Sequence, residues 1–580
     1  MLMYKYRNNY RLFLLWGTLC LLANVICTAG TAYDGDQGYW ADWVQRLMND
    51  GFGGFRGNYP PLYVIWLWVV AQVHSVLDIA VGKTFFMKFM CLWPVYFSHL
   101  FLVDWLCRFA GKFNYPQWKK HLLIAFVALN PALLLDGPVW GQVDLFPVVI
   151  AALSIYCVCR PRYLVIASML YMLAVLTKFQ MIAFLPIFGG LFIRNWKKSW
   201  KGLPLAVVGT VLVLLPFAIG GNLQGMLSKA YVQTTSLYAY ATYNGANLWF
   251  LLAGNVTPDN VPIWNLSDKG LGFIFKPIVL GKILFVIVSV FTLIKSIMCK
   301  NVRTAFALCT LNGLAFFVLL PGMHERYLVC TVPMALCWVV WDMRRGGIAC
   351  LLVTLVAMLN VNLINSFRGP DVWIIVSVVS CTTLVVSLFV IAAPKAVHKM
   401  ICLVEKLPLP SFLPYILLSV ILLIEAANLA YRNRPILVPT GDKIALLTDL
   451  NWIKWDQRYK SPRINESVDG HDLTSGSRMY KNGIGAHAPS NIVIEIPQDA
   501  DSLYVGVGID GECFHEGNAR FIIRVNGVVA WRSPLMTGRR GVEFAKIPLQ
   551  GASLLELETN PDGSDNCDHT DWLNGYIKLR

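Results

Sequence analysis

The sequence predicts a polytopic α-helical membrane domain of about thirteen spans, followed by an antiparallel β-sandwich. Apolar runs of about 15–25 residues recur between residues 12 and 430, and a span needs about 20 residues. Of the 580 residues, 56% are hydrophobic and only 14% are charged, which excludes a water-soluble protein. Beyond Tyr431 the pattern changes to short alternating runs. We therefore predict a transmembrane domain at 1–434 and a β-domain at 435–580.

The spans are predicted from the apolar runs themselves. The first is interpreted as an uncleaved helix, with a signal peptide ending near Gly30 as the alternative. Leu62 to Val81 is left out of the spans, because its apolar stretch stops after about a dozen residues, which favours an interfacial or re-entrant helix. The thirteen predicted spans are 12–29, 85–107, 121–135, 145–159, 163–176, 179–193, 203–220, 273–297, 304–320, 327–341, 347–363, 372–393 and 411–430.

The net charge of +15 belongs to the membrane part. Up to Tyr431 there are 32 Lys and Arg against 15 Asp and Glu, and after it 17 against 19. With thirteen spans the basic loops share one face, which the positive-inside rule makes cytoplasmic. We thus expect a cytoplasmic N-terminus, an extracytoplasmic C-terminal domain and no nucleic-acid partner. Cys513 and Cys567 can pair there, although the sequence does not fix their geometry.

The β-domain is predicted from runs that alternate apolar and polar residues. Asn-Gly, Asp-Gly and Pro-Asp-Gly turns separate these runs, as expected for antiparallel strands joined by hairpins. The clearest runs are 491–496, 502–507, 521–525 and 554–558.

Four polar clusters fall on the predicted outer face, and polar groups at a membrane edge are candidates for function. The clusters are Asp34 and Asp36 with Tyr59 later in the same loop; Trp140, Gln142 and Asp144 with Asp136 beside them; Lys178 and Gln180; and His324, Glu325 and Arg326.

Each cluster also has a structural explanation. The first can be a helix cap, the second a simple turn, and the third a snorkelling lysine. A Glu-Arg pair explains two residues of the fourth cluster but leaves its histidine unexplained.

A single outward-facing site explains the four clusters together. Asp36 or Asp34 would supply a base, and Lys178, His324 and Arg326 would supply cations for a phosphate oxygen. A sugar that leaves a lipid-linked phosphate needs no general acid, so one carboxylate that deprotonates an acceptor hydroxyl suffices for inversion. A monophosphate carries one negative charge, so no metal is expected in the membrane domain.

At these residues the sequence resembles the bacterial membrane relatives of the GPI mannosyltransferases, in the GT-C superfamily. The shared order is an acidic first loop, Tyr-Pro-Pro-Leu-Tyr, Trp-Gly-Gln-x-Asp, Lys-x-Gln and Met-His-Glu-Arg-Tyr, within residues 10–345. The resemblance implies an inverting transferase of the bacterial cytoplasmic membrane. It also implies a polyprenyl-phosphate hexose donor, such as mannose, a glycan, lipid or protein acceptor, and a first-loop Asp as base. By its spacing to Trp43, Asp36 matches that Asp better than Asp34. The sequence departs from the pattern at Asn58, where relatives carry Asp.

Residues 447–580 resemble the NPCBM type of carbohydrate-binding β-sandwich. Matching stretches lie at 450–452, 482–490, 505–510, 536–538 and 567–572. The residues that we predict to bind carbohydrate are His487, Asp510, His569, Asp571 and Trp572. The alternative for His487 and His569 is that they only satisfy turns. The acidic loop is also a candidate Ca²⁺ site through oxygen ligands, at Asp562, Asp565 and Asp568.

Two other functions fit the same composition. A transporter or flippase of lipid-linked sugars should carry paired polar residues at mid-span, whereas here they gather at one edge. A non-catalytic glycan-binding membrane protein leaves Asp36, Lys178, His324 and Arg326 without a task. The leading hypothesis is a hexosyltransferase whose tethered sandwich holds the acceptor glycan near the site.

Overall fold

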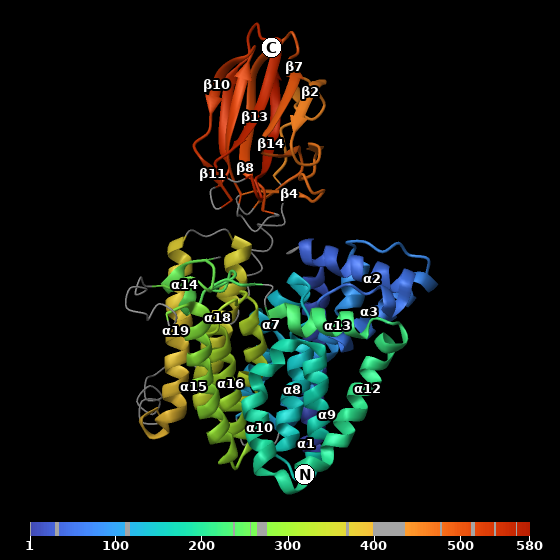
Figure 1. Cartoon of the computed structure of the whole chain (residues 1–580), viewed down its shortest axis with the longest axis vertical. Coiled ribbons are helices and arrows are strands. Elements are labelled where there is room, and N and C mark those ends of the chain that lie inside the picture. Colours follow the sequence, from blue (N-terminus) through green and yellow to red (C-terminus); the bar gives the residue numbers. More distant parts are fainter. Residues whose placement is uncertain are drawn as a thin grey trace. The chain divides into compact units, whose positions relative to one another are not determined.

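The structure is a computed structural model that describes residues 2–29, 34–110, 116–235, 238–255, 257–263, 275–366, 370–397, 436–475, 478–511, 517–538, 541–563 and 565–580. These residues form a helical unit and, from Ile436 onward, a β-unit (Figure 1). The predicted boundary at 434/435, the predicted span 411–430 and Cys513 lie outside the described residues.

Seven of the described helical segments are long and apolar enough to cross a membrane. An eighth is the pair α4 (Phe85–Cys91) and α5 (Trp93–Ala110), if this pair, which is bent by 51°, counts as one span. These helices indicate an integral membrane protein. The seven comprise α1 (Leu2–Thr28), α6 (Gln117–Ala128) with α7 (Pro131–Leu134) and η1 (Leu135–Trp140), α11 (Trp196–Ser199) with η3 (Trp200–Gly202) and α12 (Leu203–Ile219), α15 (Pro277–Ile297), α16 (Val302–Leu319), α18 (Met343–Ser366) and α19 (Pro370–Ala392).

The prediction of thirteen spans is too high for the helices that the structure describes. Four of the predicted segments form helices of 10–17 residues. A 14-residue helix is about 21 Å long, shorter than a hydrocarbon core of about 30 Å. These four are α8 (Leu145–Val158), α9 (Leu164–Thr177), η2 (Phe179–Phe184) with α10 (Leu185–Arg194), and η7 (Tyr327–Thr331) with α17 (Val332–Trp341). Leu62 to Val81, which was left out of the spans, forms the similarly short α3 (Pro61–Val76).

Burial separates interior helices from those that face outward. The apolar part of α16 is 78% buried, whereas that of α15 is only 17% buried. Exposed side chains on the outward helices are large and apolar, such as Leu212 on α12 and Ile287 on α15. A soluble protein rarely exposes so much contiguous apolar surface, and lipid chains would cover it here.

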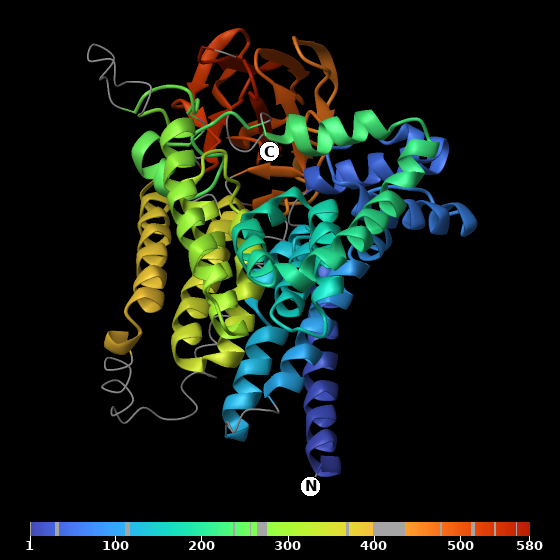
Figure 2. The ribbon, with the colours of Figure 1, turned by 60° about the horizontal axis from the view of Figure 1, so that its bottom comes forward.

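One end of the helical unit carries α2 (Asp34–Gly54) and α3, opposite the N-terminus of α1 (Figures 1 and 2). Pro60 and Pro61 start α3, because proline suits the first helical position. The shorter helices α13 (Leu223–Leu227), η4 (Ser228–Val232), η5 (Gln233–Thr235) and α14 (Leu248–Ala253) lie in the chain between α12 and α15. The side chain of Asn247 caps α14 by accepting from the backbone N–H of Trp249.

The β-unit consists of two antiparallel sheets, as predicted. One has the order β12-β8-β14-β6-β3 with β1 paired to β14, and the other has β10-β9-β13-β7-β2 with β11 paired to β9. A hairpin of β4 and β5 adds a two-stranded sheet. The strands are β1 (Ile444–Leu446), β2 (Trp452–Gln457), β3 (Arg463–Ile464), β4 (Leu473–Ser475), β5 (Arg478–Tyr480), β6 (Gly483–His487), β7 (Ser490–Glu495), β8 (Ala500–Ile509), β9 (Asn518–Val525), β10 (Val528–Arg532), β11 (Met536–Thr537), β12 (Glu543–Pro548), β13 (Leu554–Pro561) and β14 (His569–Leu579).

The two larger sheets enclose one apolar core that includes Phe521 and Trp572. The turn between β9 and β10 is the Asn526-Gly527 pair, with φ of 50° and 79°. Positive φ at both positions fits a two-residue hairpin, and the Asn526 side chain also accepts from the backbone N–H of Leu554. Three of the predicted strand runs fall within β8, β9 and β13, and the run 491–496 extends one residue beyond β7.

Candidate functional site

Asp36 lies in the first turn of α2 and is half-buried. Its Oδ2 accepts two hydrogen bonds, from Trp140 Nε1 at 2.7 Å and from Gln142 Nε2 at 2.6 Å. Its Oδ1 accepts no hydrogen bond from the residues that the structure describes. The carboxylate is thus fixed through one oxygen while the other is available. Asp34 begins α2, and its side chain lies outside the described part of the chain.

The segment after α7 supplies both donors to Asp36. The predicted simple turn at 136–144 begins instead with η1, which continues to Trp140. Gly141 then adopts a φ of +103°, a left-handed conformation that favours glycine. This reversal places Gln142 beside Trp140 on the same oxygen of Asp36.

Tyr59 joins Asp36 to the third cluster. Its hydroxyl donates to Gln142 Oε1 at 3.1 Å, so Gln142 bridges Tyr59 and Asp36. Lys178 Nζ lies 5.5 Å from the centre of the Tyr59 ring. Burial raises the pKa of Tyr59 to about 12, so the hydroxyl stays protonated and keeps donating at neutral pH.

Lys178 forms a buried ion pair with Asp144. The side chains are 6% and 0% exposed, so the snorkelling explanation is wrong. Asp136 is also fully buried, and its Oδ1 has no hydrogen-bond partner among the described residues. Gln180 is half-buried in η2. The charge of Lys178 is therefore already balanced by a carboxylate.

The fourth cluster packs on the second. Arg326 donates to Glu325 Oε1 at 2.8 Å, and its guanidinium lies 5.6 Å from the centre of the Trp140 ring. His324 Nδ1 is 3.8 Å from Glu325 Oε2, and the ring contacts those of Tyr238, Tyr243 and Tyr327.

His324 does not behave as the cation that the sequence led us to expect. Burial lowers its pKa, and the nearby Arg326 charge lowers it further, so the ring is neutral at pH 7. Within the part of the chain that the structure describes, its buried Nε2 has no hydrogen-bond partner. With Lys178 on Asp144 and Arg326 on Glu325, the arrangement favours positioning roles for these side chains.

The structure thus brings the four sequence clusters together around Asp36. One route runs from Lys178 through Tyr59 and Gln142 to Asp36, and the other from Arg326 through Trp140 to the same carboxylate. The site combines an oriented carboxylate, aromatic rings and two compensated ion pairs. Such a site can accept a proton at the Asp36 carboxylate.

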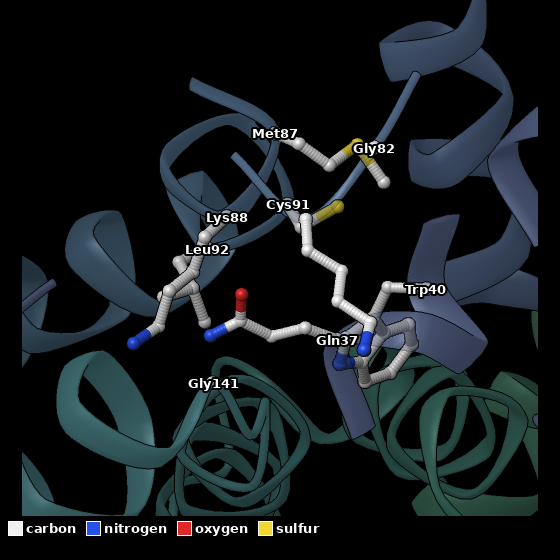
Figure 3. Close-up of a pocket in the computed structure, with 9 residues that line it drawn as sticks. Gln37, Trp40, Gly82, Met87, Lys88, Cys91, Leu92 and Gly141 are labelled. Carbon is white, nitrogen blue, oxygen red and sulfur yellow. The ribbon is translucent and has the colours of Figure 1, made fainter. Parts of the chain in front are cut away.

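Beside Asp36 lies a pocket that the sequence analysis missed. Its lining includes Lys83, Lys88, Gln37 and Gly141. Figure 3 shows Lys88 and the amide of Gln37 extending toward the segment that carries Gly141. Lys88 is 6% exposed and lies within the apolar run 85–107. An ionisable residue at membrane depth is a functional signal, and it could have singled out this position.

The carbohydrate-binding residues predicted in the β-domain divide into two groups. Trp572 is fully buried against Phe521, so its ring cannot stack on a sugar. Asp510 and Asp571 are also buried, and Asp510 accepts from the backbone N–H of Thr474. His487 and His569 lie together, with ring centres 5.3 Å apart.

The exposed side chain at this histidine pair is Tyr459, which the sequence analysis did not single out. It is 41% exposed, and its ring centre lies 4.9 Å from that of His487. The acidic loop that we considered for Ca²⁺ pairs Asp565 with Arg458, and Asp568 accepts from the backbone N–H of Asn518. Within the described ranges, no three His, Cys, Asp or Glu side chains gather as metal ligands, Asp562 included. Cys567 is disulfide-bonded, and its partner lies outside the described residues.

Two curated proteins are similar to part of this chain. The chain is 30% identical over 144 residues to a Renibacterium salmoninarum protein named as an endo-alpha-N-acetylgalactosaminidase, covering 23% of this chain and 9% of that protein. It is 31% identical over 124 residues to the alpha-1,3-galactosidase B of Akkermansia muciniphila, covering 20% and 15%. The chain thus spans less than a sixth of either relative.

Two solved structures are also similar. One is the CBM51 of Clostridium perfringens GH95 in complex with methyl-galactose, at 26% identity and a TM-score of 0.23, covering 23% of this chain and 99% of that one. The other is the arabinosyltransferase EmbB of Mycobacterium smegmatis, at 12% identity and a TM-score of 0.23, covering 98% and 64%. The resemblance stated for the C-terminal region is confirmed, since residues 443–578 match the NPCBM/NEW2 domain.

Proposed function

We propose that the protein is an inverting membrane glycosyltransferase. It moves a hexose, with mannose as the first candidate, from a polyprenyl-phosphate donor to an extracytoplasmic glycan, lipid or protein. The observation that carries this proposal is the Asp36 carboxylate, held through Oδ2 by Trp140 and Gln142 with Oδ1 available. A carboxylate oriented in this way suits a general base, because its position no longer depends on side-chain rotation.

In the proposed reaction, Asp36 Oδ1 accepts the proton of an acceptor hydroxyl. The hydroxyl oxygen forms a bond to the anomeric carbon of the donor sugar while the bond from that carbon to the phosphate oxygen breaks. Polyprenyl phosphate leaves as an anion, so no acid is needed on that side. Attack from the face opposite the phosphate inverts the anomeric centre, and no step calls for a metal ion or a cofactor.

The other residues of the cluster position this base and the sugar. Gln142 and Tyr59 fix the Asp36 carboxylate, and the Lys178–Asp144 pair supports Tyr59. Arg326 supports Trp140 through its guanidinium face. Both cations are buried and paired with carboxylates. The ion pairs therefore hold the side chains in place and add little net charge to the site.

The β-domain is proposed to hold the glycan acceptor. Two similar proteins are named for their action on N-acetylgalactosamine-containing or galactose-containing sugars. Tyr459 offers an exposed ring next to two histidines, a combination that suits a sugar face and its hydroxyls. Tethering a glycan in this way raises its concentration near the transfer site.

The decisive experiment is a transfer assay with the purified full-length protein and defined polyprenyl-phosphate hexoses. We expect Asp36→Asn to lower kcat by about 10²- to 10⁴-fold, the usual contribution of a general base. Asp42→Asn is the matched control, because Asp42 lies on the same helix in an exposed pair with Arg46.

Unchanged transfer by Asp36→Asn would refute the base assignment. An absence of turnover with every donor, together with flipping of the lipid in vesicles, would instead favour a transporter. A chelator added to the wild-type reaction should leave the rate unchanged.

A further inference from the structure

Two neighbouring turns of the helical unit carry six exposed cations. One turn joins α8 to α9, and the other leads from α10 through α11 and η3 into α12. The turns are in contact, because Asn195 Nδ2 donates to the backbone oxygen of Val158 at 3.2 Å and the backbone of Gly202 packs directly on that of Val165. We call residues 160–163 and 194–201 the basic surface. Its cations are Arg160, Arg162, Arg194, Lys197, Lys198 and Lys201.

The charges of this surface are not balanced by carboxylates. The sequence between Asp144 and Asp259 contains no Asp or Glu. None of the six cations forms an ion pair with a residue that the structure describes. The guanidinium of Arg160 lies 5.3 Å from the centre of the Tyr156 ring, a contact that leaves its positive charge in place. The basic surface therefore has a positive local potential, which favours an anionic partner.

The basic surface also presents large apolar side chains. Trp196 and Trp200, one helical turn apart, are 54% and 47% exposed, and the flanking Ile193 and Leu203 are exposed as well. Tryptophan is enriched where the hydrocarbon of a bilayer meets the headgroups. A soluble polyanion matches the cations alone. An anionic phospholipid matches both features, since it carries a phosphate next to apolar chains.

The basic surface begins a helical segment that is long enough to cross a bilayer. The segment Trp196–Ile219 has 24 residues, which as a helix extend about 36 Å, against a hydrocarbon core of about 30 Å. Just beyond its far end, Gly220 packs on Gly53 of α2, where a Cβ placed on Gly53 would lie 2.7 Å from Gly220 O. The basic surface therefore lies at the end of the helical unit opposite α2 (Figure 1).

We propose that the basic surface binds the headgroups of anionic phospholipids. Lys197, Lys198 and Lys201 donate to the phosphate, and Trp196 and Trp200 lie beside the upper acyl chains. The number of cations is sufficient to orient a helix, whereas headgroup binding also requires unpaired cations next to an apolar contact. This surface has both properties. The proposal does not depend on the proposed transfer reaction.

Native mass spectrometry of the full-length protein would test this binding. The protein is released from detergent that contains equal amounts of phosphatidylglycerol and phosphatidylcholine, and the retained molecules of each lipid are counted. We expect the wild type to prefer phosphatidylglycerol by about tenfold or more, because each cation near an anionic surface contributes about fivefold. The triple variant Lys197→Gln, Lys198→Gln and Lys201→Gln should lose most of this preference, and the corresponding triple Arg variant should keep it.

The matched control also removes three cations, by Arg56→Gln, Lys229→Gln and Lys282→Gln. Lys229 donates to the backbone oxygen of Arg56 beyond the end of α2. Lys282 lies near the start of α15, whose other end packs on Gly190 of α10. This control should keep the preference for phosphatidylglycerol.

The lysines replaced in the basic surface are exposed, so that variant should fold, and an unchanged melting temperature would verify this. The preference of the wild type should shrink as the ammonium acetate concentration rises, because salt screens exposed charges. Equal retention of the two lipids by the wild type would overturn the proposal. So would a preference that survives in the triple Gln variant, or one that both triple variants lose equally.

Discussion

Lys178 and Asp144 form the buried ion pair nearest to the Tyr59 ring. A buried pair often stabilises little in itself, but removal of one partner leaves an uncompensated charge. The informative quantity is therefore the coupling between Lys178 and Asp144 in the free energy of unfolding, which a single and a double variant can measure.

We expect Lys178→Met to destabilise the protein by about 3–5 kcal/mol, because Asp144 then remains buried and unpaired. Lys178→Met combined with Asp144→Leu should recover most of this loss, since neither charge remains. Thermal unfolding in detergent would measure both. If the double variant were as unstable as the sum of the single variants, the pair would not be coupled.

Asp568 is a pH-sensitive residue of the β-domain. Burial raises its pKa to about 6, and the backbone N–H of Asn518 and the charge of His569 only partly oppose this. Its Oδ2 accepts no hydrogen bond from the residues that the structure describes. Because the folded-state pKa is above the unfolded value, the stabilisation from protonation is complete below about pH 4 and is lost as the pH rises through 6.

We expect Asp568→Asn to stabilise the β-domain at pH 7.5 by about 1 kcal/mol, because the neutral amide removes the charge that burial disfavours. The difference between variant and wild type should shrink as the pH falls to 4.5. Urea unfolding of residues 436–580 at both pH values would measure it. An equal difference at both pH values would show that Asp568 is not the titrating group.

At the scale of elements, the break between η1 and α8 decides where the donors to Asp36 lie. The sequence predicted a helix to residue 135 and a loop after it, but the helix continues as a π-turn to Trp140. The spacing of hydrophobic residues does not reveal a π-turn, because a π-turn differs from an α-helical turn by only one additional residue. The positive φ of Gly141 then reverses the chain.

We expect Gly141→Ala to lower transfer more than it lowers stability. Ala resists the left-handed conformation by about 1–2 kcal/mol, so the backbone that presents Gln142 to Asp36 would relax away. Gly189→Ala is the control, because Gly189 lies within α10 with open space at its Cβ position. Transfer rates and melting temperatures would be compared. Wild-type rates in Gly141→Ala would show that the turn does not set the site.

At the scale of the whole molecule, the chain divides into two units with separate cores. The sandwich buries its own apolar side chains between two sheets, and the helical unit exposes apolar faces on α12 and α15. The apolar core of the β-unit is formed by its own residues. We therefore expect residues 436–580 to fold alone.

We expect isolated residues 436–580 to bind glycans on an array, and Tyr459→Ala to weaken that binding about tenfold, as loss of a ring worth roughly 1–1.5 kcal/mol does. Its melting temperature should not change, because Tyr459 is a surface residue. Phe544→Ala, which removes another exposed ring on β12, is the control. Equal losses in both variants would place the glycan elsewhere.

The sequence by itself determined the membrane class, the β-domain with its strand runs, and the four clusters that contain the candidate site. These follow from composition, period and turn residues, which act locally. Only the tertiary structure decided that Gln142 bridges Tyr59 and Asp36, that Lys178 is paired with Asp144, and that Trp572 is core. Those facts depend on contacts between residues up to about a hundred positions apart, for which a single sequence carries no local signal. The shorter helices likewise show that an apolar run specifies burial, but not whether lipid or protein provides it.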